Sequence, residues 1–201
     1  MLPPSLQRLI SHFIAFPGVG PRQATRFALY LAKHPEASLI LQKTLMEVEK
    51  EAGLCVDCFL PYEKGTMRSG QCSICANPQR ASDMLCVTEK ETDALRLEQA
   101  GTYGGKYFIL GGTLTPLRQD TQVKDRIALL KRRLASSPPQ ELILALNPTR
   151  EGTFTALYIE EILKNVSGSL RITRLGRGLT TGAEIEYIDE ETLQSALEGR
   201  K

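Results

Sequence analysis

The sequence predicts an α+β protein built from several modules: an N-terminal helical hairpin, a small four-cysteine module, an α/β domain with a mainly parallel sheet, and a short C-terminal strand-helix segment. Three observations support this fold class. Apolar residues recur at helical spacing through residues 4–52, two CxxC pairs interrupt that periodicity within residues 55–80, and apolar runs alternate with helical patterns from residue 84 onward. We therefore expect four segments, with the boundaries 1–53, 54–80, 81–168 and 169–201.

The composition suits a globular chain that carries one medium domain or a few small ones. Of its 201 residues, 42% are hydrophobic and 24% are charged, which is enough apolar material for a real core. The net charge of +2 is small, so a role with nucleic acid must depend on where the charge lies. No apolar run approaches the roughly 18 to 20 residues of a membrane span, and the N-terminal stretch lacks the pattern of a secretory signal. We expect a cytoplasmic protein that does not enter a membrane.

The first module is predicted to contain three helices. Residues 4–15 and 22–33 carry apolar side chains at helical spacing, and they flank the stretch FPGVGP. A third helix is expected over residues 37–52, where apolar residues again share one face before Gly53 ends the helix.

The turn between the first two helices is a candidate phosphate-binding site. Gly18 and Gly20 allow a sharp turn and a close approach of the backbone to a ligand, because neither carries a Cβ. Pro21 is a favourable first helical residue, and the free amides of the helix that it starts would face outward. Arg22 and Arg26 lie one helical turn apart and can share a face beside those amides. This is the helix-hairpin-helix pattern of sequence-independent DNA binders; the alternative is an ordinary helical hairpin with a solvated arginine pair.

Four of the five cysteines are predicted to bind one structural Zn²⁺ per chain. Cys55, Cys58, Cys72 and Cys75 form two CxxC knuckles that can converge tetrahedrally on the metal. Four thiolates leave no open coordination position, so this zinc would stabilise a module that is poor in large apolar side chains. A redox pair and chance spacing are the alternatives. Cys86 falls inside an apolar run and is expected to be a small buried hydrophobe.

The α/β domain is expected to contain a parallel sheet with helices on its faces. The strands are the apolar runs MLCVT, KYFIL, ELILAL and LRITRL, and helical patterns over residues 89–100, 123–135 and 153–165 separate them. A further strand is expected at EIEYI. A short helix should follow from Asp189, its N-cap, to Leu197.

Two acids lie where strands of this sheet are predicted to end. Glu89 follows MLCVT and Glu151 comes shortly after ELILAL, so the two could form a carboxylate pair for Mg²⁺. Asn147 stands where a metal-dependent phosphoryl-transfer enzyme would need an aspartate. Two-metal cleavage requires more ligands than this, so we expect no catalytic residues and interpret the position as a former metal site used for protein contact.

Other basic residues could add to a nucleic-acid surface, although each group also fits an ordinary solvated face. They are Arg118, Lys124, Lys131, Arg132, Arg133, Arg171, Arg174 and Arg177. Nothing marks the two histidines, His12 and His34, as catalytic.

The chain resembles the RecR family of recombination mediators over essentially its whole length. The hairpin GVGPRQATR, the four-cysteine module, the segment YFILGGTLTPL and the ending LGRGLTTGAEIEYIDEETLQSALEGR occur in that family's order. The resemblance implies a Toprim-like α/β domain and a non-enzymatic protein of recombinational DNA repair. Such proteins form a ring-like homotetramer that clamps DNA. They act with RecO and RecF to load recombinase onto single-stranded DNA.

The resemblance also implies roles for particular residues. It places Arg22 and Arg26 against DNA, puts Glu89 and Glu151 on the surface that engages a RecO-like partner, and gives the C-terminal segment a part in joining subunits. The chain departs from the family pattern in RQDTQVKD, residues 118–125, and in TFTA, residues 153–156, so local loop details do not carry over there.

Two other functions remain open from the sequence. A Toprim nuclease or topoisomerase-like phosphoryl transferase would use Glu89 and Glu151 with a metal, and its mark would be DNA cleavage that depends on Glu89. A zinc-braced adaptor that binds only protein would leave the two hairpin arginines unused, and its mark would be association without DNA.

Overall fold

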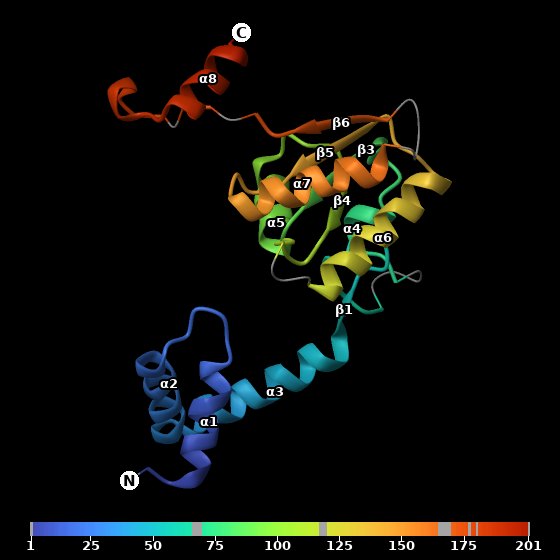
Figure 1. Cartoon of the computed structure of the whole chain (residues 1–201). Coiled ribbons are helices and arrows are strands. Elements are labelled where there is room, and N and C mark those ends of the chain that lie inside the picture. The colour runs from blue at the N-terminus through green and yellow to red at the C-terminus, as the bar shows by residue number, and fades with distance from the viewer. Residues whose placement is uncertain are drawn as a thin grey trace. The chain divides into compact units, whose positions relative to one another are not determined.

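The computed structural model describes residues 2–65, 70–116, 120–164, 170–176, 178–179 and 181–200. Arg118 and Arg177, two of the basic residues considered above, lie outside these ranges. The chain divides into two compact units, Met1–Ala52 and Gly53–Lys201 (Figure 1). Among the helices that could be examined, none combines the length and the apolar character that crossing a membrane requires.

The first unit consists of α1 (Pro4–Ile14), α2 (Pro21–Lys33) and α3 (Pro35–Glu51). Each helix begins with proline, whose fixed φ suits the first helical turn and whose missing N–H costs nothing there. α1 and α2 pack through Phe13 and Phe27, whose ring centroids are 5.7 Å apart in an edge-on arrangement. Ala24 and Ala28 are fully buried, so their small side chains let the two helices approach closely. These contacts hold the turn between α1 and α2 in place.

The second unit contains a four-stranded sheet with the order β4-β3-β5-β6 and only parallel pairings. Its strands are β3 (Ala81–Thr88), β4 (Gly105–Ile109), β5 (Glu141–Ala145) and β6 (Arg171–Arg174). The helices between successive strands are α5 (Glu91–Ala100), α6 (Thr121–Ser136) and α7 (Arg150–Leu163). The predicted alternation of strands and helices is confirmed.

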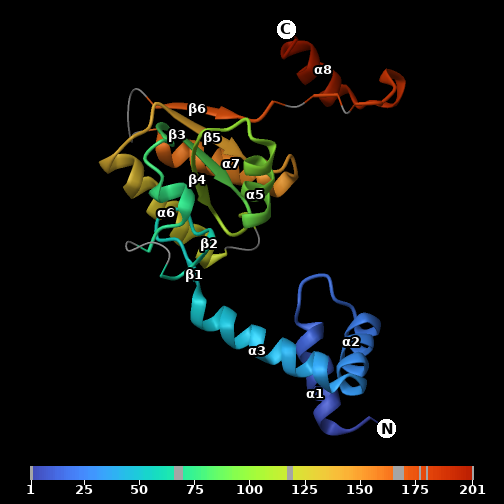
Figure 2. The same cartoon turned by 180° about the vertical axis from the view of Figure 1, so that it is seen from behind.

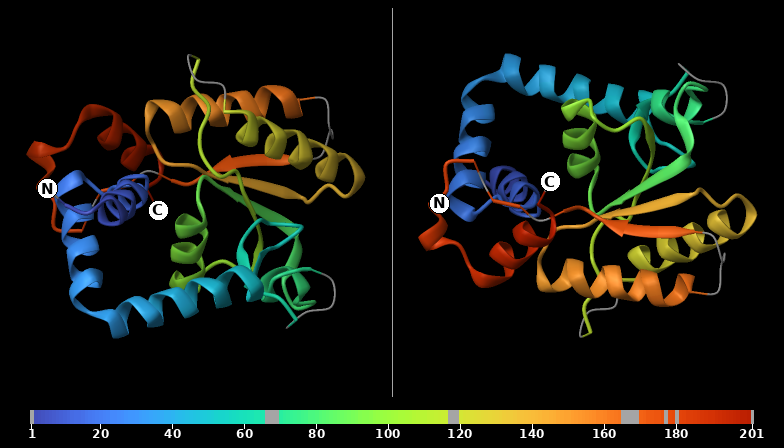
Figure 3. Two further views of the ribbon diagram at one scale, coloured as in Figure 1. Left: turned by 90° about the horizontal axis from the view of Figure 1, so that it is seen from below. Right: turned by 90° about the horizontal axis from the view of Figure 1, so that it is seen from above.

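Each face of this sheet is covered by different elements. α6 and α7 lie on one face, and α5 lies on the other together with the cysteine module (Figure 3). The alternation of side chains along β3 matches this division: Leu85 and Val87 join the core under α6 and α7, whereas Cys86 joins the core that contains the four CxxC cysteines. Cys86 is 2% exposed, so its predicted burial is confirmed.

The cysteine module consists of short elements. β1 (Ala52–Leu54) and β2 (Pro61–Glu63) form a two-stranded sheet (Figure 2). The second CxxC pair begins at the N-cap of α4 (Ser73–Ala76), which is Cys72, and ends inside that helix at Cys75. All four cysteines are buried in the same core cluster as Tyr107 and Ile109 of β4. The module is therefore packed against the sheet rather than standing apart from it.

The C-terminal segment differs from its prediction at one element. A strand at EIEYI is wrong: Ile185–Tyr187 is a single 3-10 turn, η1, and α8 (Glu190–Glu198) follows it. A strand needs a neighbour for its backbone hydrogen bonds, and within the described part of the chain this stretch pairs with none. The predicted N-cap of α8 is confirmed, because the Asp189 carboxylate accepts a hydrogen bond from the Thr192 N–H at 2.9 Å.

Candidate functional site

The turn between α1 and α2 leaves the N-terminus of α2 without a side-chain cap. Gly18 adopts a φ of +77° and Gly20 is the N-cap, with a φ of −82° and a ψ of 166°. The first hydrogen bond of the helix runs from the Ala24 N–H to the Gly20 carbonyl at 3.0 Å. The amides of Arg22 and Gln23 precede it, so they belong to the first-turn donors that a helix cannot satisfy internally. Their orientation and the helix dipole favour a negatively charged ligand at this point.

No described residue fills the space beside the two glycines. A Cβ built at Gly18 or at Gly20 would meet no atom within 4 Å. Gly18 is explained by its positive φ, which residues with a side chain adopt at a cost. Gly20 has an extended backbone that any residue can adopt, so neither its conformation nor its packing accounts for the missing side chain. A ligand that approaches the backbone closely would account for it.

Arg22 and Arg26 are both exposed, and they lie one turn apart on α2. Neither guanidinium forms an ion pair within the ranges that the structure describes. Two exposed cations therefore flank an uncapped helix N-terminus, as the sequence predicted. We call Gly18, Gly20, Arg22 and Arg26 the hairpin site.

The other basic residues behave differently from the hairpin pair. Arg171 pairs with Glu141 at 2.8 Å and Arg174 pairs with Glu160 at 2.9 Å. Arg133 donates a hydrogen bond to the backbone carbonyl of a residue in the cysteine module. The candidate basic groups that could be examined in the α/β domain are thus partly engaged within the protein.

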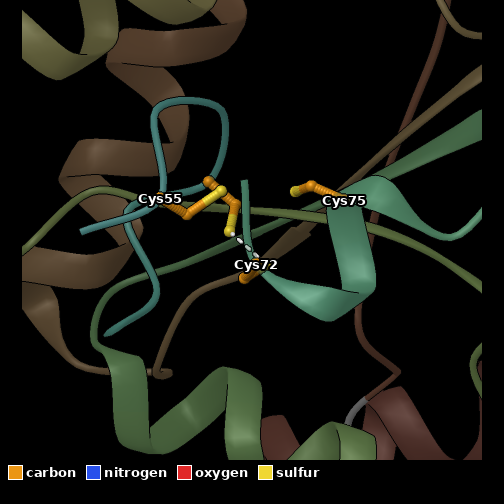
Figure 4. A group of neighbouring side chains, drawn as sticks. Cys55, Cys72 and Cys75 are labelled. Carbon is orange, nitrogen blue, oxygen red and sulfur yellow. Dashed lines mark hydrogen bonds between the residues drawn. The ribbon is translucent and has the colours of Figure 1, made fainter. Parts of the chain in front are cut away.

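The sulfurs of Cys55, Cys58, Cys72 and Cys75 all lie within 4.8 Å of one another. Figure 4 labels Cys55, Cys72 and Cys75 of this cluster. The Cys58 and Cys72 sulfurs are 3.5 Å apart. In a tetrahedral site with Zn–S bonds of about 2.3 Å, neighbouring sulfurs are roughly 3.8 Å apart. The four cysteines therefore fit a tetrahedral metal ion.

The electrostatics of the cluster favour a cation at its centre. The hydrogen bond to Cys75 and burial both raise the pKa of Cys58, and burial raises the pKa of Cys72. The hydrogen bond from Cys58 lowers the pKa of Cys75 to about 6. A divalent metal at the centre would favour the thiolate form of all four cysteines, because it offsets the cost of burying their negative charge.

A cation-π contact fastens the first knuckle of the cysteine module to the α/β domain. The Arg126 guanidinium carbon lies 4.3 Å from the centre of the Phe59 ring, and Arg126 also donates to the Ile109 carbonyl at 3.2 Å. Phe59 packs edge-on against Phe108, with centroids 5.4 Å apart. The Ile109 N–H donates to the Cys58 carbonyl at 3.1 Å. Sequence reasoning missed Arg126, because nothing in the helical pattern of residues 121–136 distinguishes a buried arginine from a solvated one.

The two predicted acids lie in different environments. Glu89 is 5% exposed and follows β3 directly. Its Oε1 accepts from the Asn147 backbone N–H at 2.9 Å, and its Oε2 accepts from the Asn147 side-chain amide at 2.6 Å. Glu151 is exposed in the first turn of α7. The structure thus brings Glu89 against Asn147 and leaves Glu151 on the surface.

Comparisons with known proteins cover both units of the chain. Residues 6–48 match the family described as RecR, helix-hairpin-helix; residues 83–176 match Toprim domain; and residues 181–201 match RecR, C-terminal. The chain is 40% identical over 202 residues to the Recombination protein RecR of Gloeothece citriformis, covering 100% of this chain and 98% of that protein. Identity to the protein of the same name from Prochlorococcus marinus is 39% over 196 residues, with 97% and 94% covered. For Thermosynechococcus vestitus it is 38% over 197 residues, with 98% and 94% covered.

Proposed function

The chain belongs to the RecR family of recombination proteins, and from that membership we propose that it is a DNA-binding mediator of recombinational repair that catalyses no reaction of its own. It holds DNA without regard to sequence, and it works with RecO-like and RecF-like partners to load recombinase onto single-stranded DNA. The observation that supports this most directly is the hairpin site: an uncapped helix N-terminus beside two exposed arginines.

The chemistry of the hairpin site suits the sugar-phosphate backbone. The backbone amides of Arg22 and Gln23 can donate to phosphate oxygens, and the Gly20 position leaves room for a phosphate to approach the chain. The guanidinium groups of Arg22 and Arg26 add charge-assisted hydrogen bonds to neighbouring phosphates. None of these groups reads a base edge, so binding should depend on charge and shape rather than on sequence.

We propose that the four-cysteine cluster stabilises the fold and takes no part in catalysis. Four sulfur ligands complete a tetrahedral site, so a bound Zn²⁺ has no position left for water or substrate. We therefore assign Zn²⁺, one per chain, a structural role in the segment of residues 54–80.

Self-association would raise the affinity for DNA, because a single hairpin site is small. One hairpin site contributes only two cations, and several sites on one assembly act together. Apolar side chains of α3 are left exposed in the single chain; they include Leu39, Ile40, Leu45, Met46 and Val48. We propose a homotetrameric clamp, for which light scattering should give four times the 22.3 kDa of one chain.

The carboxyl ends of β3 and β5 are the proposed contact for a RecO-like partner. Glu151 is exposed there and can pair directly with a basic residue of the partner. Glu89 is buried against Asn147, so its contribution to such a surface would come from holding the loop that precedes α7.

The test of DNA binding uses full-length, zinc-loaded protein. Fluorescence anisotropy with single-stranded and duplex DNA should show that Arg22→Ala with Arg26→Ala weakens binding at least about tenfold and lowers the salt slope by up to about 0.9 for each phosphate that the variant no longer neutralises. Lys131→Ala with Arg132→Ala is the matched control, because it removes two exposed charges from α6. Unchanged affinity and an unchanged salt slope in Arg22→Ala with Arg26→Ala would mean that the hairpin site does not bind the DNA.

The competing phosphoryl-transferase function is tested on the same preparations. Supercoiled, linear and single-stranded DNA should stay intact during incubation with Mg²⁺ or Mn²⁺. Cleavage that Glu89→Gln abolishes would replace the mediator proposal with the nuclease.

A further inference from the structure

We infer that Asn147 takes the place of a divalent cation at the carboxyl end of the sheet, where its hydrogen bonds stabilise the buried Glu89 carboxylate. We call the pair Glu89 and Asn147 the clasp. The clasp holds this end of the sheet together, and its role does not depend on whether the hairpin site binds DNA.

The Glu89 carboxylate needs a partner because it is buried. With 5% of the residue exposed, an ionised carboxylate there would be costly unless it is paired or hydrogen-bonded. Both of its oxygens are engaged by one residue: the Asn147 N–H donates to Oε1 at 2.9 Å, and the Asn147 side-chain amide donates to Oε2 at 2.6 Å. A carboxylate without a proton can only accept, so Asn147 must present its NH₂ group and not its carbonyl oxygen.

The N-terminus of α7 closes the remaining space around the clasp. A Cβ built at Gly152 would lie 2.9 Å from the Glu89 Oε1 and 2.1 Å from the Asn147 carbonyl oxygen. The first turn of α7 therefore touches the Glu89 carboxylate, and the positive end of the helix dipole further stabilises the negative charge of that carboxylate. The backbone approaches so closely that only glycine fits at this position.

This arrangement does not fit Mg²⁺. Magnesium takes oxygen ligands in a near-octahedral shell and keeps several of its waters. Asn147 directs two N–H groups toward Glu89. A metal ligand must offer a lone pair, and the partly positive hydrogen of an N–H group repels a cation instead. Glu151 is exposed, and Asp93, which lines the same cavity as Asn147, accepts a hydrogen bond from the Lys90 N–H at 3.0 Å. Glu89 is the buried acid at this place, and both of its carboxylate oxygens are already hydrogen-bonded.

The clasp links segments of the sheet edge that a shared metal ion would otherwise link. It joins the residue after β3 to the loop after β5, and the Gly111 N–H donates to the Glu89 carbonyl at 2.8 Å, so the end of β4 is tied to the same point. Asn147 itself is exposed and lines a cavity together with Gly152. A cation from solution could therefore reach the Glu89 carboxylate if the Asn147 amide did not occupy that position.

One substitution should convert the clasp into a cation site. Asn147→Asp replaces the donor with a second carboxylate of nearly the same shape, and two carboxylates at this distance require either a proton or a cation between them. Zinc-loaded protein is titrated with Mn²⁺, which prefers oxygen ligands and leaves the thiolate cluster to zinc. We expect Mn²⁺ to raise the melting temperature of Asn147→Asp by about 3 °C or more and to leave the wild type unchanged.

The controls distinguish a specific site from general ion binding. Glu89→Gln combined with Asn147→Asp should lose the Mn²⁺ effect, because one carboxylate then faces a neutral amide. Asn147→Asp that folds but gains no stability from Mn²⁺ would contradict the inference. Should Asn147→Asp fail to fold, Mn²⁺ binding to the wild type and to Glu89→Gln is compared by electron paramagnetic resonance. Equal Mn²⁺ binding by the two proteins supports the clasp. A Mn²⁺ ion that the wild type binds and Glu89→Gln does not bind overturns the inference.

Discussion

Gly18 and Gly20 stand two residues apart in the turn before α2, and the protein needs them for different reasons. The turn requires a positive φ at Gly18 in the folded protein, whether or not a ligand is present. Gly20 meets no such demand, since its φ is −82° and its Cβ position is open. Stability and DNA binding should therefore respond separately to substitution at the two positions.

Gly18→Ala should destabilise the first unit by about 1 to 2 kcal/mol, because alanine is strained at positive φ. Gly20→Ser should leave stability unchanged or slightly higher, because serine is a favourable N-cap. It should nevertheless weaken DNA binding several-fold, since the serine hydroxyl competes for the first-turn amides and its Cβ fills the approach to them. Urea denaturation and anisotropy on the same samples separate the effects; a Gly20→Ser variant with wild-type DNA affinity contradicts this role for the turn.

Cys86 should be chemically silent in the native protein. Burial raises the pKa of its thiol from 9.0 to about 12, so the neutral form persists in the folded state. The unfolded state loses this proton first, so the group favours folding fully below about pH 9 and progressively less between about pH 9 and 12. Iodoacetamide labelling read by mass spectrometry should modify Cys86 in urea and spare it in native protein at pH 8. Rapid native labelling would show that the β3 position is open.

At the scale of elements, α6 fastens the cysteine module to the sheet. Arg126 stacks on Phe59 of the first knuckle, and Arg133 donates to the Asp57 carbonyl at 2.9 Å. Phe59 adopts a φ of +67°, an uncommon value for a residue with a large side chain, and its ring is held between Arg126 and Phe108. The conformation of the knuckle thus depends on its contacts with α6 and β4 as well as on the four-cysteine cluster.

Arg126→Met should loosen this attachment. Methionine keeps most of the stem, but it cannot form the cation-π interaction and it leaves the Ile109 carbonyl without its donor from Arg126, so we expect a destabilisation of about 1 to 3 kcal/mol. Zinc transfer to a colorimetric chelator should become faster. Arg132→Met, an exposed position on the same helix, is the control and should change neither quantity. An unchanged rate of zinc transfer in Arg126→Met would show that the helix does not brace the knuckle.

The elements were predictable where a local pattern implied the structure, and not where a distant partner decided it. The four strands of the sheet are apolar runs because both faces of a parallel sheet are covered, and this signal was present in the sequence. EIEYI carries a similar β-favouring composition, yet Ile185 is 66% exposed and Tyr187 is 81% exposed in a 3-10 turn. Composition could not reveal that this stretch pairs with none of the strands that the structure describes.

The same distinction applies to the sites. Cysteine spacing alone was enough to predict that the four cysteines converge, because the two knuckles each need only a short loop. The pairing of Glu89 with Asn147 joins residues that are 58 positions apart, and only the register of β3 beside β5 brings them together. The sequence showed that an acid was missing at Asn147. It could not show that the amide donates to Glu89.

At the scale of the whole molecule, the four-cysteine cluster and the sheet share one core. In the first unit, the buried hydrophobic residues are Ala24 and Ala28 of α2. The cysteines cluster with Cys86, Tyr107 and Ile109, and neither core cluster of the second unit contains a residue before Cys55. Metal removal should therefore act on the second unit and spare the first.

Stripping the metal with a chelator under reducing conditions should lower the melting temperature of the second unit by more than about 10 °C, because structural zinc contributes a large share of the folding free energy of such modules. Acidification should do the same as the thiolates take up protons. Circular dichroism should still show the helices of residues 1–52. A chelated protein that melts like the untreated one would mean that the cluster is not a metal site.

The hairpin site is where we propose that DNA is held, and hydrogen exchange with and without DNA tests this most directly. Zinc-loaded, full-length protein should show slower exchange of the amides at residues 18–26 when single-stranded or duplex DNA is bound, because phosphate oxygens accept from first-turn donors that are otherwise open to water. Protection should fall off at high salt together with binding. DNA-dependent protection confined to the sheet or the cysteine module, with residues 18–26 exchanging as in the free protein, would contradict it.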